Sequence, residues 1–472
     1  MSIPALTPFP AIVIGGGISG LTCAYHLQQT GIPVRVLEAG DRPGGVIATQ
    51  EQDGFRFELG PQSFLSTEPL LNLVESLGLK NELLQADPRA PRYIFFRGQL
   101  VPAPLAPPSL LTTPLLGAGT KWRLFTEMFR RSIPPASDES IACFVRRKFG
   151  DEVLHRLVAP FISGIYAGDP EKLSLRASFP TLHEFETQAG SVLRGAMKSR
   201  RGTRGSGPGL CSFREGMETL PRALAARLGD ELVTQTTVVG ARHGKANGYS
   251  SFEMEVTRNG RRETLLSSAL VVAAPVNAAS EILNSVSGKF AAPFARITYA
   301  PVAVVSAGYR CEQVRQAVNG FGFLVPRSEG LRVLGTVWNS SLFPGCAPPN
   351  MACFTSFAGG ATDPKLFDKS DDEILDLICG EVGRILGITG PPVASQVRRY
   401  ARALPQYNLG HTETVSALGA AASSIPGLFL AGNYLSGPSI GSCVEQANQT
   451  AEAVRLYLAS IGVAGVGATA HA

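Results

Sequence analysis

The sequence predicts an α/β protein with three parts: a doubly wound parallel sheet assembled from separated segments, a mixed-sheet domain and a mostly helical insertion. Three observations support this. An apolar strand runs into a glycine-rich turn and a helix near the N-terminus, helix-forming segments dominate from about Glu68 to Arg222, and alternating apolar and polar residues return after position 232. A period of two indicates strands and a period near 3.6 indicates helices.

The opening segment has a complete β-α-β pattern. Residues 11–14 (AIVI) read as a buried strand, SGLTCAYHLQQTG carries apolar residues at helical spacing until Gly31, and a second strand (VRVLEA) occupies 34–39. Such a unit is the expected start of a doubly wound parallel sheet.

The central third of the chain favours helices. PLLNLVESLGL, KWRLFTEMFRR and ESIACFVRRKFG have helical character, and strand alternation is scarce there. A basic run within this part is interleaved with Gly and Ser, which predicts a solvated flexible loop. Its residues are Arg194, Lys198, Arg200, Arg201 and Arg204.

Strand patterns then resume. The dipeptide Asn259-Gly260 between alternating segments predicts a hairpin, and ALVVAAP at 269–275 predicts a strand that returns to the first sheet. Residues 299–358 predict an antiparallel sheet, DDEILDLICGEVGRILG a helix, and residues 427–460 a closing strand and helix. The predicted division is 1–66, 210–290 and 412–472 for the parallel-sheet domain, 67–100 and 291–411 for the second domain, and 101–209 for the helical part.

Composition narrows the classes of function. The 472 residues include 44% hydrophobic and 17% charged residues, typical of a folded globular protein of more than one lobe, and the net charge of +5 is too small to indicate nucleic-acid binding. The eight cysteines show neither CxxC nor metal-ligand spacing, so neither a metal site nor a disulfide framework is expected. No signal peptide is visible, which makes a cytoplasmic setting the expectation.

One uncharged stretch, GQLVPAPLAPPSLLTTPLLGAGT at 98–120, approaches the length of a membrane span. Its five prolines forbid a continuous helix. An apolar loop, a wall of a substrate channel and a peripheral membrane contact all remain open for it.

The first turn carries a phosphate-binding pattern. Gly15-x-Gly17-x-x-Gly20 lies between the first strand and helix, where Gly15 allows the tight turn, Gly17 allows backbone to approach a pyrophosphate and Gly20 allows close packing. Glu38 at the end of the second strand can accept hydrogen bonds from ribose hydroxyls. These features predict dinucleotide binding without separating NAD from FAD.

The residues after Glu38 favour FAD over NAD. Arg42-Pro43-Gly44-Gly45 resembles the second glycine pair of the flavoproteins that include amine oxidases and phytoene desaturases. The segments ELGPQSF, RYIFFRGQLVPAP, SGIYAGDPEKLSLRASFP, FREGMETLPRALAARLG, GFGFLVP, LPQYNLGH and LFLAGNYLSGPSIGSC, in this order, resemble the oxygen-dependent protoporphyrinogen oxidases over nearly the whole chain. The resemblance implies a glutathione-reductase-like FAD-binding fold.

The resemblance also implies particular FAD contacts. They are Gly15, Gly16, Gly17, Ile18, Ser19, Gly20, Glu38, Ala39, Arg42, Gly45, Val46, Gly60, Pro61, Gln62, Ser63, Val238, Asn433, Pro438, Ser439 and Ile440. The segment 438–442 departs from the family's usual Val-Ala-Val or Gly-Leu-Asn type, so backbone contacts are expected there.

For the substrate, the family pattern implies that Arg92 meets a propionate, that Phe321 and Leu324 sandwich a pyrrole ring, and that Gly168 lies nearby. The implied reaction is oxidation of protoporphyrinogen IX by FAD and molecular oxygen, in three rounds of hydride transfer that each release hydrogen peroxide. No acid or base in a family motif is assigned a catalytic role. Coproporphyrinogen III is the alternative substrate, and a homodimer stays open. Amine oxidation, carotenoid desaturation and a non-enzymatic FAD scaffold are more remote alternatives.

Overall fold

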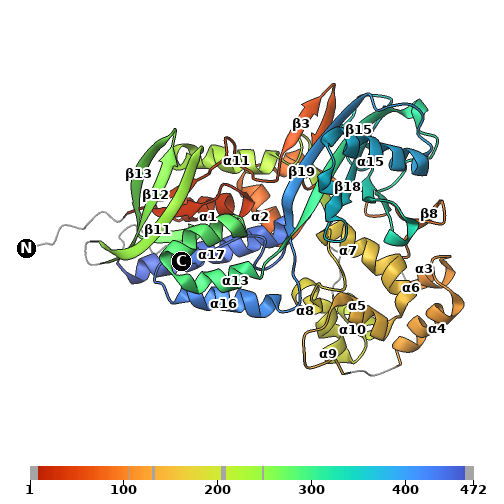
Figure 1. Cartoon of the computed structure of the whole chain (residues 1–472), viewed down its shortest axis with the longest axis horizontal. Helices are drawn as coiled ribbons and strands as arrows, with labels where there is room; N and C mark the ends of the chain where they lie inside the picture. The colour runs from red at the N-terminus through yellow and green to blue at the C-terminus, as the bar shows by residue number, and fades with distance from the viewer. Residues whose placement is uncertain (1–8, 106, 130–132, 203–208, 247–248, 463–472) are drawn as a thin grey trace, which may run out of the picture.

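The computed structural model describes residues 9–105, 107–129, 133–202, 209–246 and 249–462. Parallel-sheet, mixed-sheet and helical parts are visible in Figure 1. The three-part architecture expected from the sequence is thus present as an α/β fold with mixed sheets. The assignment of domain boundaries stays a proposal.

The first sheet has five parallel strands in the order β10-β2-β1-β14-β20. Its strands are β1 (Ala11–Ile14), β2 (Val34–Leu37), β10 (Leu232–Val233), β14 (Ala269–Val272) and β20 (Leu428–Leu430). The strands predicted at 11–14, 34–39, 269–275 and 427–435 are therefore confirmed as members of one sheet. They come from three separated segments, because parallel neighbours need long crossover connections.

Both faces of this sheet are covered, which explains why β1 is apolar at every position. Ala11 and Val13 face helices α1 (Ile18–Gln29), α2 (Glu68–Ser76), α11 (Thr219–Leu228) and α17 (Ile440–Ser460). Ile12 and Ile14 face the other way, toward helices α12 (Val276–Val286), α13 (Ala291–Ala295) and α16 (His411–Ser423) and a three-stranded sheet.

That three-stranded sheet is an antiparallel meander of β11 (Thr236–Ala246), β12 (Tyr249–Arg258) and β13 (Arg261–Ser267). Asn259 and Gly260 both have positive φ, 48° and 74°, as a two-residue hairpin turn requires. The predicted hairpin is confirmed.

The second large sheet has seven strands in the order β19-β15-β18-β17-β16-β7-β8. They are β19 (Ala394–Pro405), β15 (Tyr299–Arg310), β18 (Met351–Gly359), β17 (Val333–Val337), β16 (Gly322–Leu324), β7 (Arg92–Phe96) and β8 (Gln99–Pro102). The pairing is antiparallel except between β16 and β7. Helix α15 (Asp371–Leu386) covers one face.

Strands β7 and β8 interrupt the segment from Glu68 to Arg222 in which helices were expected to dominate, and they lie mostly in the part, 67–100, that was predicted to join the second domain. Their sequence, RYIFFRGQLVP, lacks strict alternation because the strands enter a sheet with apolar contacts on both sides. Short strands β5 (Phe64–Leu65), β6 (Leu83–Gln85) and β9 (Leu210–Phe213) form a further small sheet, and β3 (Thr49–Gln52) pairs with β4 (Phe55–Glu58).

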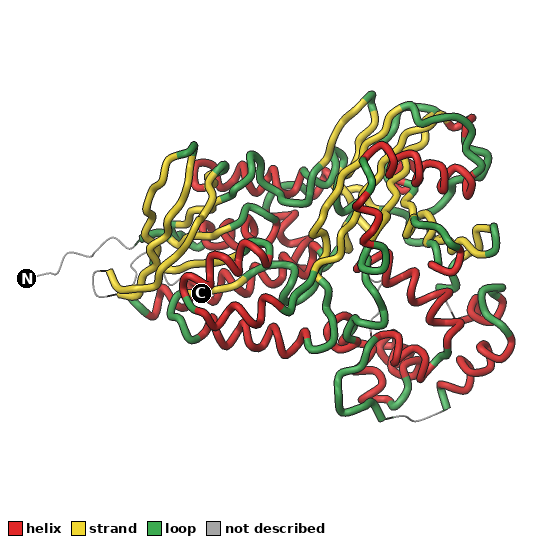
Figure 2. The backbone as a smooth tube through the Cα atoms, in the orientation of Figure 1, coloured by secondary structure: helices red, strands yellow, loops and turns green. Residues whose placement is uncertain are grey.

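The helical part, lower right in Figure 1 and mostly red in Figure 2, contains eight α-helices among the described residues between 107 and 202. They are α3 (Pro107–Thr112), α4 (Ala118–Glu127), α5 (Ile141–Lys148), α6 (Asp151–Val153), α7 (Ala159–Tyr166), α8 (Leu175–Ser178), α9 (Pro180–Ala189) and α10 (Val192–Gly202). The flexible loop predicted for the basic run is wrong: Arg194, Lys198, Arg200 and Arg201 belong to α10, and Arg204 lies outside the described residues.

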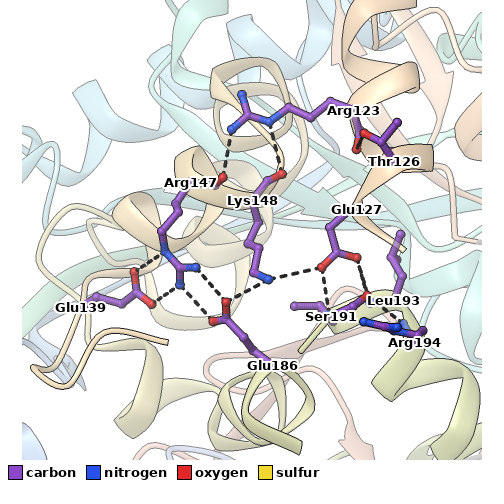
Figure 3. Close-up of polar contacts among 11 residues, drawn as sticks. Arg123, Thr126, Glu127, Glu139, Arg147, Lys148, Glu186, Ser191, Leu193 and Arg194 are labelled. Carbon is purple, nitrogen blue, oxygen red and sulfur yellow. Dashed lines mark hydrogen bonds and ion pairs between the residues drawn. The ribbon is translucent and has the colours of Figure 1, made fainter. Parts of the chain in front are cut away.

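A buried ionic network joins four of these helices (Figure 3). Lys148 of α5 contacts Glu186 of α9 at 2.8 Å and Glu127 of α4 at 3.4 Å. Arg147 pairs with Glu186 at 2.7 Å and with Glu139 at 2.6 Å. Glu127 also accepts a hydrogen bond from the backbone amide at the start of α10 at 3.0 Å. An acidic residue of α4 therefore fixes the start of α10, which explains the helix there.

Candidate active site

The glycine turn after β1 has two kinds of glycine. A Cβ on Gly15 (φ 109°) would lie 2.7 Å from the carbonyl oxygen of Ala273, and one on Gly20 would lie 2.0 Å from the carbonyl oxygen of Gly15. The protein's own backbone therefore excludes side chains at both. A Cβ on Gly17 would meet nothing within 4 Å. The space beside Gly17 is open where the backbone amides at the start of α1, including Ile18 and Ser19, attract an anion.

Glu38 lies at the end of β2 beside this turn. Its two carboxylate oxygens accept hydrogen bonds of 2.6 Å from the amides of Gly16 and Gly40. Each oxygen keeps a lone pair that can accept a ribose hydroxyl. Ala39 is the exposed neighbour of Glu38.

The second glycine pair lies directly against the first turn. The amide of Gly44 donates to the carbonyl of Gly16 at 2.8 Å, and both Gly44 and Gly45 have positive φ. The Arg42 guanidinium donates to three carbonyls of this loop, those of Pro43, Gly45 and Ile47, at 2.8–3.1 Å. Arg42 therefore shapes the loop in this structure.

The loop Gly60–Ser63 lies against the same segment. A Cβ on Gly60 would lie 2.0 Å from the carbonyl oxygen of Val46, whose side chain is 44% exposed. Gln62 is buried, donates to the Gly60 carbonyl at 2.9 Å and accepts from the Asn339 amide at 2.7 Å. Pro61 precedes it. Asn339, in α14 (Asn339–Leu342), was not singled out from the sequence, since only the fold brings it to the loop.

Helix α17 begins beside α1. Ser439 caps α17 by accepting from the amide of Ser442 at 3.1 Å, and Ile440 begins the helix after Pro438. The Cys443 thiol, whose pKa burial raises to about 11, hydrogen-bonds with Ser19 of α1. Two helix N-termini therefore lie side by side, and both favour negative charge.

Two further predicted contacts have defined surroundings. The carbonyl of Asn433 accepts a 2.5 Å hydrogen bond from the Tyr407 hydroxyl, which fixes the loop before α17. Val238 is buried with Ile14 and Leu37 at the edge of the parallel sheet.

Burial lowers the pKa of His411, which stacks on Tyr407 at 4.1 Å, to about 4, so this histidine is neutral near pH 7.

The turn, the carboxylate and the two helix N-termini fit a flavin dinucleotide. The open position at Gly17 is the critical observation, because its φ of −75° and its surroundings would accept a side chain. Within the described residues, no group of three or more His, Cys, Asp or Glu side chains could hold a metal ion.

Three of the predicted substrate residues, Arg92, Phe321 and Leu324, lie on or next to strands β7 and β16 of the seven-stranded sheet. Arg92 pairs with Gly322 across β7 and β16, and its guanidinium lies over the ring of Phe321 at 5.2 Å. Phe321 packs with Leu342 and Phe343. The structure thus brings Arg92 and Phe321 together.

Leu324 has different neighbours. A Cβ on Gly164 of α7 would lie 2.8 Å from its side chain, and one on Gly335 of β17 would lie 2.9 Å from it. Phe321 and Leu324 thus have different neighbours, and the pyrrole ring between them stays a prediction. Gly168 is buried, and a Cβ there would lie 2.6 Å from Leu173.

The sheet register shows apolar residues that the sequence analysis missed. Leu324 pairs with Gly335, which pairs with Phe357, and the Leu324 side chain lies over the glycine. A bulge between Val333 and Gly335 puts Leu334 into one cluster with Phe357 and Ala167. Alternation alone could not show this, because a bulge reorients side chains.

Comparisons with known proteins agree with this geometry. Residues 18–455 match the family described as flavin containing amine oxidoreductase. Protoporphyrinogen oxidase 1 of Arabidopsis thaliana chloroplasts is 35% identical, over 95% of this chain and 88% of the relative. Coproporphyrinogen III oxidase of Bacillus subtilis is 29% identical, over 95% of this chain and 98% of the relative.

A crystal structure from Exiguobacterium sp. 255-15, provisionally titled a protoporphyrinogen oxidase, has a TM-score of 0.81 at 24% identity, covering 95% of this chain and 99% of that chain. At this identity the likeness supports the fold alone. The match over most of the chain and the fit of the glycine turn lead to one conclusion: the chain belongs to the flavin-containing amine oxidoreductases, within the family of the protoporphyrinogen and coproporphyrinogen III oxidases, and is an FAD-dependent oxidoreductase.

Proposed function

We propose that this enzyme oxidises protoporphyrinogen IX to protoporphyrin IX, with molecular oxygen as the final acceptor and hydrogen peroxide as the second product. The observation that carries the proposal is the pair of partly exposed apolar side chains Leu324 and Phe357, backed by buried Leu334, on the sheet that also bears Arg92. A largely apolar macrocycle with few carboxylates suits an apolar surface with a cation at its edge. We also propose that the FAD-binding fold is of the glutathione-reductase-like type.

When bound, FAD supplies a two-electron acceptor for hydride from carbon. The protein's part is binding and orientation. The α1 and α17 N-termini and Glu38 would hold the dinucleotide, and the Tyr407 hydroxyl would keep the Asn433 loop in place at the flavin edge. Arg92, braced by Phe321, would fix a propionate and so set which carbon faces the flavin.

Coproporphyrinogen III is the second candidate, because a relative at 29% identity is named for it. The test is a side-by-side fluorescence assay of both porphyrinogens with FAD-loaded enzyme, together with oxygen consumption and peroxide detection. Six-electron oxidation predicts three oxygen molecules consumed for each porphyrin formed. If coproporphyrinogen III is oxidised faster than protoporphyrinogen IX, coproporphyrinogen III is the substrate instead. No porphyrin from either compound would contradict the function.

A peripheral membrane contact is also proposed, through the proline-rich stretch and the helix that follows it. Within that stretch Leu105 and Leu111 are each 58% exposed, whereas Leu115 and Leu116 are buried. Exposed aromatic residues lie on and just after α4: Trp122 is 67% exposed and Phe129 71%, and Phe125 packs between them. In the part of the chain that the structure describes, no helix is long and apolar enough to cross a bilayer.

Liposome flotation tests this contact. Wild-type protein should float with anionic vesicles, and the double variant Trp122→Ser/Phe129→Ser should stay with the soluble fraction. Leu456→Ser, which removes an exposed apolar side chain of α17, is the matched control and should float like wild type. Equal flotation of all three proteins would exclude the α4 surface as the contact.

A further inference from the structure

Two cysteines lie together where the β3–β4 hairpin packs on the seven-stranded sheet. Phe55 and Phe57 of β4 form a buried cluster with Cys353 of β18, and Cys346 packs against the same cluster. The Phe55 ring is so close to β15 that a Cβ on Gly308 would lie 2.4 Å from it. The hairpin and the sheet therefore meet tightly around the two thiols.

The local chain holds the two cysteines in place. The turn between them is closed by a 3.1 Å hydrogen bond from the Met351 amide to the Pro348 carbonyl. The Cys353 amide donates to the Ser340 hydroxyl at 3.0 Å. Both cysteines pack in the same cluster, and both are free.

The two thiols differ in access. Cys353 is fully buried, and its pKa is raised well above the usual range by the neighbouring Cys346 thiol and by burial. Cys346 is only partly buried, and its thiol donates to the Phe343 carbonyl at 3.4 Å. Peroxide reacts with an accessible thiolate, so the partly exposed Cys346, once deprotonated, would react first, with Cys353 as the adjacent resolving thiol.

We propose that Cys346 and Cys353 are a peroxide-responsive dithiol that closes to a disulfide. The Cys346 sulfur attacks one oxygen of hydrogen peroxide, which breaks the O–O bond and yields a sulfenic acid and water. The Cys353 sulfur then attacks the Cys346 sulfur, which forms the S–S bond and breaks the S–O bond. The sulfenic hydroxyl leaves with the Cys353 thiol proton as a second water. Two thiols lose two electrons, and one peroxide gains them.

The position of the pair gives the disulfide a structural consequence. The Cys346 carbonyl accepts from the Arg56 amide of β4 at 3.0 Å, and β4 leads through Glu58 to the loop Gly60–Ser63. A disulfide would tie the 346–350 turn covalently to β18 beneath this hairpin. If the enzyme releases peroxide, as proposed above, its own product would form this disulfide.

Mass spectrometry can test the pair directly, because trypsin cleavage after Arg332 and Lys365 leaves both cysteines in one peptide. The FAD-loaded enzyme is treated with graded hydrogen peroxide, and free thiols are then blocked with N-ethylmaleimide. We expect this peptide to become lighter by two hydrogens, to escape blocking, and to recover both thiols after dithiothreitol. Cys143 and Cys311, which are exposed, serve as internal controls that should not lose hydrogens within their peptides.

Two variants identify the order of events. Cys346→Ser should abolish the two-hydrogen loss, and Cys353→Ala should leave a sulfenic acid at Cys346 that dimedone traps. The proposal is overturned if the wild-type peptide gains oxygen at Cys346 without losing two hydrogens, or stays reduced at peroxide levels that oxidise Cys143. The peroxide is added, so either failure would leave the proposed porphyrinogen oxidation untouched.

Discussion

The variant Gly17→Ala tests whether the glycine at this position is required for folding or for binding FAD. Gly17 caps α1 with φ −75° and ψ 176°, which an alanine adopts without strain, and its Cβ would meet nothing within 4 Å. Alanine is a poorer N-cap than glycine by a few tenths of a kcal/mol to about 1 kcal/mol, and it restricts the unfolded chain by a similar amount in the stabilising direction. The stability of the FAD-free protein should therefore change by less than about 1 kcal/mol.

Binding of FAD should change much more. The new methyl group would fill the space that the pyrophosphate needs at the start of α1, at the cost of one or two charge-assisted hydrogen bonds. Each contributes about 1.5–3 kcal/mol, so the dissociation constant should rise at least roughly tenfold, since about 1.4 kcal/mol is a factor of ten. Flavin fluorescence titration measures the affinity, and denaturant unfolding of the FAD-free protein measures the stability.

Gly20→Ala is the matched control, with the opposite pattern. Its Cβ would lie 2.0 Å from the Gly15 carbonyl oxygen, so the FAD-free protein itself should lose stability. An unchanged FAD affinity in Gly17→Ala would refute the placement of the pyrophosphate. A loss of stability in FAD-free Gly17→Ala would show instead that the glycine serves the fold.

Three further predictions concern side chains. Arg92→Ala should raise KM for the porphyrinogen roughly ten- to a hundredfold with little change in the flavin spectrum, and Arg92→Lys should recover only part of the loss because it lacks the planar fork; steady-state kinetics identical to wild type would end this assignment. Burial raises the pKa of Glu58 to about 7, from about 4.5 for an unperturbed carboxyl. The folded state thus holds this proton more tightly than the unfolded chain, so stability should decline as the pH rises from about 4.5 to 7, and unfolding of Glu58→Gln should show a flatter pH profile. Lys148→Met removes a cation between two buried carboxylates and should cost about 3–5 kcal/mol of unfolding free energy, whereas Lys80→Met, at an exposed ion pair, should cost less than about 1 kcal/mol; equal denaturation midpoints for the two variants would contradict the importance of burial.

The sequence alone determined the local units and the chemistry of the first turn. Strand, turn and helix at 11–29 follow from apolar periodicity and from the glycine spacing, and the hairpin at Asn259-Gly260 follows from residues that tolerate positive φ. These features depend on neighbours close in the chain. The family resemblance was likewise readable, since it rests on motifs in order.

Tertiary structure decided what depends on distant partners. Strands β7 and β8 form a local hairpin at Arg97-Gly98, but only the fold places β7 against the parallel edge of β16. The basic segment after Ser191 is a helix because Glu127, far away in sequence, accepts hydrogen bonds at its start. Leu334 reaches Phe357 only through a bulge in β17. In each case the free energy comes from a long-range contact, which periodicity within one segment does not report.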